Sequence, residues 1–332
     1  MKTIKITRTG FPSVGNFSWM NYFRDVLSLK YNVIVDSKTP DIVFYSNLHF
    51  QEGELDHYTG EPIRCLADYD DNVKKIFISG EARPGYTGHI TDGVNRFALG
   101  YEHIEHERYL RFPTSVLDAY VLYNESNMFD TPFDWLLKPR DSESVLSSKK
   151  HFCSVVQRSF NEDRDQLFTA LEKKGHYIKS SGPWRCTISP EEELNMYKYH
   201  NYSNKEYMGK IDGLIYKDKI NFFSNTVFNI AFQYHSDVDY LVQEKIIHAY
   251  AGDCIPLFYG NKYIEEEGFN PETFINCHNF NNFDEIAEHV THIYNDKTLL
   301  KRMYESPVFI NNKLPDYFNK EYLLTFFEKI LS

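Results

Sequence analysis

The stretch Phe228-Asn229-Ile230-Ala231-Phe232 is apolar at every position but one, which is typical of a buried strand. After a polar loop, Val242 to Tyr250 carries apolar residues at helical spacing, and Gly252 ends the helix. The stretch Ile255-Pro256-Leu257-Phe258-Tyr259 is a second apolar strand. Strands that alternate with helices in this way predict an α/β fold with a mainly parallel sheet.

The same alternation extends from this stretch toward both ends of the second half. Apolar patterning predicts strands at 152–156, 177–178 and 274–276, and helices at 163–174, 283–294 and 322–331. Gly175 follows the first of these helices, where a glycine commonly caps a helix. The second half is therefore expected to be one α/β domain.

The first half repeats the pattern. Strands are predicted at 4–6, 33–35, 41–45, 75–79 and 97–100, with the strand at 33–35 buried, and helices at 19–29 and 115–122. A polar stretch at 139–150 has few apolar residues, which favours a linker. We therefore expect two Rossmann-like domains, 1–145 and 150–332, with a ligand site in the cleft between them at the carboxyl ends of strands.

Composition narrows the class of function. The chain has 332 residues and a formal net charge of −11, which argues against a nucleic-acid-binding protein. A phosphate-bearing ligand would need a local basic pocket. The N-terminus has no apolar signal segment, no stretch is long and apolar enough to span a bilayer, and the five cysteines have no metal-ligand spacing. These features predict a cytoplasmic protein.

Two strand-to-helix junctions of the second half carry charged residues. Glu244 and Lys245 stand near the start of the helix at 242–250, and Arg164 stands near the start of the helix at 163–174. Free N–H groups and a partial positive charge at a helix N-terminus, together with a cationic side chain, can hold a diphosphate. The pattern alone favours two ordinary amphipathic helix starts over a diphosphate site.

Acidic residues suggest two further kinds of chemistry. Glu81 follows the strand at 75–79, at the rim where sites form, and its carboxylate could take a proton from an attacking hydroxyl. A loop salt bridge with Arg83 is the alternative. Asp68-Tyr69-Asp70 and Asp237-Val238-Asp239 have the Asp-x-Asp form that holds a divalent metal beside a diphosphate in some sugar transferases, although a solvated loop explains each as well.

Taken together, three blocks resemble the α1,3/4-fucosyltransferases, glycosyltransferase family ten. The longest block runs from Phe228 through Glu244-Lys245-Ile246 and the Ile-Pro strand that ends in Tyr259-Gly260 to the turn Phe269-Asn270-Pro271. The second is 152–182, with its Arg164 helix and its Ser-Gly turn, and the third contains Gly80-Glu81 and 108–113. The resemblance covers about 40–309, more loosely in the middle, and is to the bacterial members without a membrane stem.

This resemblance implies a GT-B fold, an acceptor-binding first domain and a second domain that binds GDP-fucose. The implied reaction is inverting transfer of fucose to a hydroxyl of a glycan acceptor, α1,3 to GlcNAc or Glc, without a metal. Glu81 matches the general base and Glu244 the carboxylate that contacts the fucose ring. The implied donor-binding residues are Arg164, Lys245, Tyr240, Gln233 and Tyr234, and the implied acceptor-binding residues are Glu81, Arg83 and Arg111. No nucleic acid or transmembrane segment is expected, while peripheral membrane association is left open.

The sequence departs from the family on the donor side. Where the family has Phe-Glu-Asn-Ser, this chain has Phe232-Gln233-Tyr234-His235, and Gln243 replaces a threonine. The tyrosine of that segment, Tyr240, stands one place early. Two alternatives therefore stay open, a GT-B transferase that uses another nucleotide sugar and a glycan-binding relative without catalysis. The presence of the four charged candidate residues together argues against the second.

Overall fold

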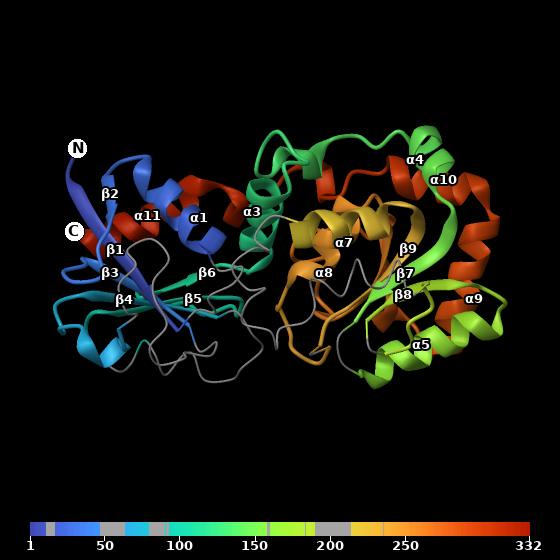
Figure 1. The fold of residues 1–332 in the computed structure, drawn as a ribbon, viewed down its shortest axis with the longest axis horizontal. Helices are drawn as coiled ribbons and strands as arrows, with labels where there is room; N and C mark the ends of the chain where they lie inside the picture. The colour runs from blue at the N-terminus through green and yellow to red at the C-terminus, as the bar shows by residue number, and fades with distance from the viewer. Residues whose placement is uncertain are drawn as a thin grey trace. The chain divides into compact units, whose positions relative to one another are not determined.

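The computed structural model describes residues 1–10, 17–46, 64–79, 90, 93–157, 160–182, 184–189, 214–234 and 236–332. The chain divides into two compact units (Figure 1). Unit 1 consists of Met1–Val121 together with Pro315–Ser332, and unit 2 is Leu122–Leu314. Each unit contains a parallel sheet, as the alternating pattern predicts.

The sheet of unit 1 has the order β2-β1-β3-β4-β5-β6, and every neighbouring pair is parallel. Its strands are β1 (Thr3–Thr9), β2 (Asn32–Val35), β3 (Ile42–Tyr45), β4 (Lys74–Ile78), β5 (Arg96–Gly100) and β6 (Tyr109–Arg111). The prediction that β2 is buried is wrong, because Ile34 is 44% exposed. The reason is that β2 pairs with β1 alone and lies at the edge of the sheet.

The apolar core of unit 1 joins the two ends of the chain. Helix α1 (Phe17–Ser28) and the last helix, α11 (Lys320–Leu331), pack against each other. Phe23 of α1 stacks on Phe44 of β3 with 4.6 Å between ring centroids, and Phe327 of α11 meets both rings edge-on. The sequence placed all of 150–332 in the second domain, whereas the structure packs α11 in unit 1, because its apolar face completes this core. Unit 1 also contains the first part of α3 (Ser115–Ser126).

The sheet of unit 2 has the order β11-β10-β9-β7-β8 and is also parallel throughout. Its strands are β7 (His151–Val156), β8 (Ile178–Ser181), β9 (Thr226–Phe232), β10 (Ile255–Tyr259) and β11 (Ile275–Asn276). The chain first extends the sheet from β7 to β8 and then returns to the other side of β7 with β9. All seven residues of β9 are buried, which explains its nearly continuous apolar sequence.

Helices cover both faces of this sheet (Figure 1). On one face, α5 (Glu162–Lys173), α9 (Phe283–Asn295) and α10 (Lys297–Glu305) share one apolar cluster with the strands. On the other face, α7 (Leu214–Ser224) and α8 (Glu244–Ala251) pack against each other, and α8 packs on β9 and β10. This arrangement places the N-termini of α5 and α8 beside the carboxyl ends of the strands that precede them.

The segment predicted as a linker is part of unit 2. It contains α4 (Ser142–Ser148), whose N-cap Asp141 accepts hydrogen bonds from the backbone N–H groups of Glu143 and Ser144. Val145 and Leu146 pack against the apolar cluster, while Lys301 of α10 forms an ion pair with Glu143 at 2.8 Å. The linker prediction is wrong because this short helix is capped by Asp141 and packs on unit 2 through Val145, Leu146 and polar contacts with α10.

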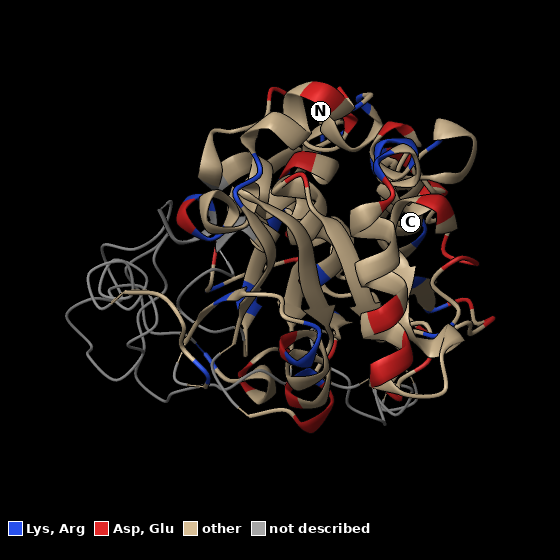
Figure 2. Ribbon diagram, turned by 90° about the vertical axis from the view of Figure 1, so that its right-hand side faces the viewer, with Lys and Arg blue, Asp and Glu red and all other residues tan. Residues whose placement is uncertain are grey.

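Charged residues of both signs lie interspersed on the described helices (Figure 2). No helix in the described part of the chain is both long enough and apolar enough to cross a membrane.

Candidate active site

The order of the unit 2 strands singles out one place on the sheet. The chain runs from β7 outward to β8 and then back to β9, so β7 and β9 are neighbours whose following connections leave in opposite directions. Open parallel sheets bind ligands outside the carboxyl ends of the strands at such a switch point. The first turns of α5 and α8 follow these two strands, and they contain three of the donor-side candidates.

Arg164 is held at this switch point. The Asn161 side chain caps α5 by accepting a hydrogen bond from the backbone N–H of Arg164 at 3.0 Å. The guanidinium donates through Nη2 to the carbonyl oxygen of Phe232, at the end of β9, at 2.7 Å. Burial lowers the pKa of Arg164, and the charge of Glu244 opposes that effect. The guanidinium of α5 is thus fixed against β9, within electrostatic reach of the first residue of α8.

Glu244 and Lys245 open α8 and form an ion pair, with 2.7 Å between Lys245 Nζ and Glu244 Oε1. Burial would raise the pKa of Glu244, but the positive charges of Lys245 and Lys219 outweigh it, and the pKa is lowered. The structure therefore places the side chains of Lys245 and Arg164 within electrostatic reach of an ionised Glu244, and the roles that the sequence suggests for these three residues stay predictions. Two cations at two helix N-termini are suited to a diphosphate, and the carboxylate is suited to positive charge on a sugar ring.

The loop before α8 is held by a residue that the sequence did not single out. Asn261, just after β10, is fully buried, and its Oδ1 accepts hydrogen bonds from the backbone N–H groups of Tyr240 and Tyr263, each at 2.9 Å. Tyr240 has a φ of 63°, in the left-handed region that non-glycine residues rarely adopt. Its ring stacks on Tyr263 with 5.1 Å between centroids. Asn261 thereby fixes the backbone three residues before Gln243, the N-cap of α8.

Two of the residues that depart from the family, Gln233 and Tyr234, directly follow β9. Gln233 is 1% exposed, and within the described part of the chain neither Oε1 nor Nε2 of its side chain has a hydrogen-bond partner. It packs on Gly260, where a Cβ would come within 2.6 Å of the carboxamide. Tyr234 is 57% exposed and lies near Arg164. A buried carboxamide without partners is uncommon and costly, so Gln233 offers unused hydrogen-bonding capacity at the switch point.

Two further residues that the sequence did not single out, Lys219 and His248, lie near Glu244. Lys219 of α7 approaches His248 of α8, with 3.0 Å between Nζ and Nδ1. His248 is buried, and burial together with Lys219 holds its pKa well below the usual value. The two residues are far apart in sequence and neither belongs to a local motif, so only the packing of the two helices reveals them.

The acceptor-side candidates belong to unit 1. Glu81 and Arg83 lie outside the described residues. Arg111 ends β6, and its guanidinium lies 5.6 Å from the centre of the Tyr317 ring. The roles of all three in acceptor binding stay predictions.

The metal-dependent alternative gains no support from the described acidic residues. Asp239 forms an ion pair with Lys262 at 3.3 Å, and Asp68 accepts a hydrogen bond from the backbone N–H of Cys65 at 2.8 Å. Across the described ranges, no group of three or more His, Cys, Asp or Glu side chains is placed to hold a metal ion.

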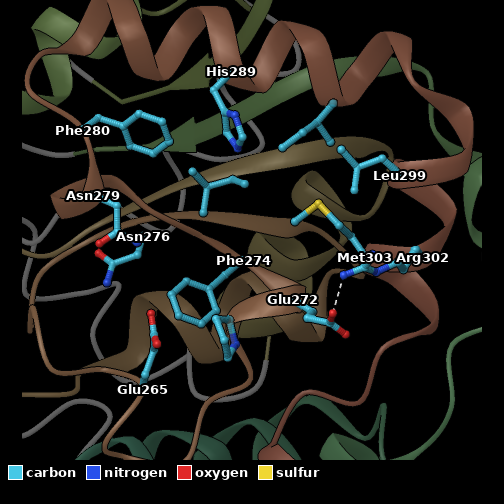
Figure 3. Close-up of a pocket in the computed structure, with 13 residues that line it drawn as sticks. Glu265, Glu272, Phe274, Asn276, Asn279, Phe280, His289, Leu299, Arg302 and Met303 are labelled. Atoms are coloured by element: carbon cyan, nitrogen blue, oxygen red, sulfur yellow. Dashed lines mark hydrogen bonds and ion pairs between the residues drawn. The ribbon is translucent and has the colours of Figure 1, made fainter.

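A cavity of about 330 Å³ lies elsewhere in unit 2 (Figure 3). Its apolar wall includes Phe274, Phe280 and Met303, and an ion pair between Arg302 and Glu272 lies at its rim. None of the donor-side candidates is among the 13 residues that line it. It is therefore separate from the switch-point site.

Comparison with known proteins relates the chain to one family of glycosyltransferases. The sequence model of glycosyltransferase family 10 (fucosyltransferase), C-terminal part, matches residues 145–306. The chain is 26% identical over 300 residues to the α-(1,3)-fucosyltransferase FucT of Helicobacter pylori, covering 86% of this chain. It spans 59% of the length of that relative.

Solved structures show the same fold. An α1,3-fucosyltransferase with GDP-fucose superposes with a TM-score of 0.66 at 21% identity, covering 100% of this chain and 91% of the other. The same kind of enzyme with GDP gives 0.65 at 20% identity over 99% and 90% of the two chains.

The fold is therefore GT-B, the two-domain α/β architecture of nucleotide-sugar glycosyltransferases. Within that class, the resemblance to the α1,3/4-fucosyltransferases of family ten is confirmed, and the match to the family's C-terminal part lies within unit 2.

Proposed function

We propose that this chain is an inverting fucosyltransferase that transfers fucose from GDP-fucose to a hydroxyl of a glycan acceptor, α1,3 to GlcNAc or Glc. The observation that carries the proposal is the convergence of Arg164, Glu244 and Lys245 at the switch point of unit 2. The similarity to an α-(1,3)-fucosyltransferase and to a structure with GDP-fucose supports fucose as the sugar.

The reaction is a single displacement at the anomeric carbon. In this proposal, Glu81 takes the proton of the acceptor hydroxyl, and the oxygen attacks the anomeric carbon from the face opposite the diphosphate. The bond from that carbon to the β-phosphate oxygen breaks, and GDP leaves with the electron pair. Arg164 and Lys245 stabilise the charge on the departing diphosphate, and Glu244 offsets positive charge that develops on the ring.

Two cationic side chains supply the charge that a metal ion would otherwise provide, so the proposal requires no metal. It also includes the cytoplasmic location predicted from the cysteine pattern.

The experiment is a transfer assay with purified chain, GlcNAc- and Glc-containing acceptors and a panel of donors. We expect acceptor-dependent release of GDP from GDP-fucose and a product with inverted anomeric configuration. Turnover with another nucleotide sugar and none with GDP-fucose would instead establish the alternative donor, which Gln233 and Tyr234 motivate. Donor binding without turnover on any acceptor of the panel would favour a binding protein.

Glu81→Gln tests the base. This change keeps the shape of the side chain and removes the proton acceptor, so turnover should fall by roughly 10²–10⁴-fold. The affinity for GDP, measured by calorimetry, should stay unchanged, because the donor-side residues lie in unit 2. Wild-type turnover in Glu81→Gln would place the base elsewhere, with Glu102, Glu105 and Glu107 as the next candidates.

A further inference from the structure

The contact between Lys219 and His248 defines which nitrogen of the imidazole carries the proton. An ammonium group can only donate hydrogen bonds. Because Lys219 Nζ lies 3.0 Å from His248 Nδ1, that nitrogen must be the acceptor, and the neutral ring carries its hydrogen on Nε2. His248 is 1% exposed, so a second positive charge in this place would be strongly unfavourable. The pair therefore consists of one cation and one neutral ring.

Helix geometry directs this cation toward Glu244. Glu244 and His248 are four residues apart on α8 and so lie on the same face of the helix, one turn from each other. Lys219 reaches that face from α7, which packs beside α8. Among the described residues, the cations that act on Glu244 are thus Lys245 on its own helix, Lys219 on α7 and Arg164 on α5, and the neutral His248 lies one turn further along α8.

These three cations differ in the groups that they neutralise or contact besides Glu244. In the proposed function, Arg164 and Lys245 neutralise the diphosphate of the donor. Once a diphosphate is bound, much of their positive charge is matched by phosphate oxygens and is no longer available to Glu244. Lys219 is turned toward His248, and it remains to balance the carboxylate when the donor is present.

We propose that Lys219, held in place by His248, is a positioning residue that keeps Glu244 ionised and oriented beside the donor sugar. This inference rests on the proposed role of Glu244. It adds a third cation and a neutral histidine to a site in which the sequence had indicated two cations and a carboxylate.

The first test compares Lys219→Met, which removes the charge, with Lys219→Arg, which keeps it. At saturating acceptor, Lys219→Met should lower kcat about tenfold at neutral pH and change the KM for GDP-fucose less than about threefold. Without Lys219, Glu244 takes up a proton more readily. The acid limb of the kcat profile should therefore move to higher pH by about one unit, the lower end of the effect of a neighbouring charge. Lys219→Arg should restore both quantities.

A double variant separates charge from packing. Lys219→Met removes the hydrogen bond that Lys219 donates to His248 Nδ1 in the buried region between α7 and α8, which can disturb the two helices by itself. Lys219→Met/His248→Phe replaces both polar groups with apolar ones and should recover the unfolding midpoint. If the charge matters, kcat and the acid limb of this double variant stay as in Lys219→Met. Recovery of wild-type kcat in the double variant would overturn the proposal and show that the pair only joins α7 to α8.

Two further measurements distinguish the other outcomes. If GDP affinity falls as far in Lys219→Met as in Lys245→Ala, Lys219 binds the diphosphate itself and the positioning role is wrong. If Glu244→Gln keeps wild-type kcat, both the role of Glu244 and this inference fail. A low kcat in Glu244→Gln together with a normal profile in Lys219→Met overturns the inference and leaves the proposed function intact.

Discussion

Replacing Asn261 by alanine should loosen the loop that leads into α8. In the structure, Asn261 Oδ1 accepts two backbone hydrogen bonds at 2.9 Å, from Tyr240 and Tyr263. Leaving a buried donor without its partner costs about 1–3 kcal/mol, so two donors give roughly 2–6 kcal/mol. Because Tyr240 and Tyr263 are partly exposed, water replaces some of this bonding, and we expect about 2–4 kcal/mol of lost unfolding free energy.

The matched control is Asn261→Asp, which keeps the accepting oxygen. The change replaces Nδ2, which has no hydrogen-bond partner among the described residues, with a second oxygen, and ionisation of the buried carboxyl adds a cost of its own. Chemical denaturation followed by tyrosine and tryptophan fluorescence measures the free energy of unfolding of both variants. Calorimetry with GDP measures whether the donor affinity to which Lys245 is proposed to contribute has changed. We expect Asn261→Ala to lose stability and GDP affinity together and Asn261→Asp to keep more of both. The reasoning is refuted if Asn261→Ala unfolds within about 0.5 kcal/mol of the wild type, the usual range for a surface change.

Three other predictions concern the donor-side residues, the metal requirement and two glycines of unit 2. Arg164→Ala and Lys245→Ala should each weaken GDP binding by about 1.5–3 kcal/mol, the range for a hydrogen bond to a charged group, and unchanged affinity in both would sink the diphosphate assignment. Transfer should persist in EDTA, whereas a complete loss that Mn²⁺ restores would favour a metal held by an acidic triplet. Gly182→Ala should lower the free energy of unfolding by about 3 kcal/mol or more, because φ is 113° and a Cβ would overlap the carbonyl oxygen of Gln157. The control is Gly175→Ala, where φ is 84° and no described atom lies near the new Cβ, and it should lower the free energy of unfolding by about 1 kcal/mol.

Sequence reasoning was most successful where the signal is local. Apolar runs such as 228–232 and 255–259 correspond to β9 and β10 because a strand buried on both faces must be apolar throughout. The helices at 163–174 and 283–294 were found within one residue at each end for a similar reason, since each needs a regular apolar stripe. Each of these patterns is contained in about a dozen neighbouring residues, so it can be recognised without information from the rest of the chain.

The errors arose where distant parts of the chain decide the outcome. Nothing in 320–331 indicates that this amphipathic helix packs in unit 1, because its partners Phe23 and Phe44 lie near the other end of the sequence. Helix α4 was missed because its apolar face is only two residues wide. The candidate site shows the same division. Arg164, Glu244 and Lys245 were found from their places at two strand-to-helix junctions and from a family resemblance, while Asn261, Lys219 and His248 depend on side-chain contacts between separate elements.

The position of α11 has a consequence for biosynthesis. A ribosome releases the strands of unit 1 first, but Phe326 and Phe327 emerge only after all of unit 2 has been made. Until then the rings of Phe23 and Phe44 lack the cover that the finished protein gives them. Unit 2 is continuous in sequence and can fold while the chain is still attached, so we expect the second unit to become protease-resistant before the first. A nascent chain stalled just before Pro315 would then expose an apolar aromatic surface of unit 1, of the kind that chaperones recognise and that favours aggregation.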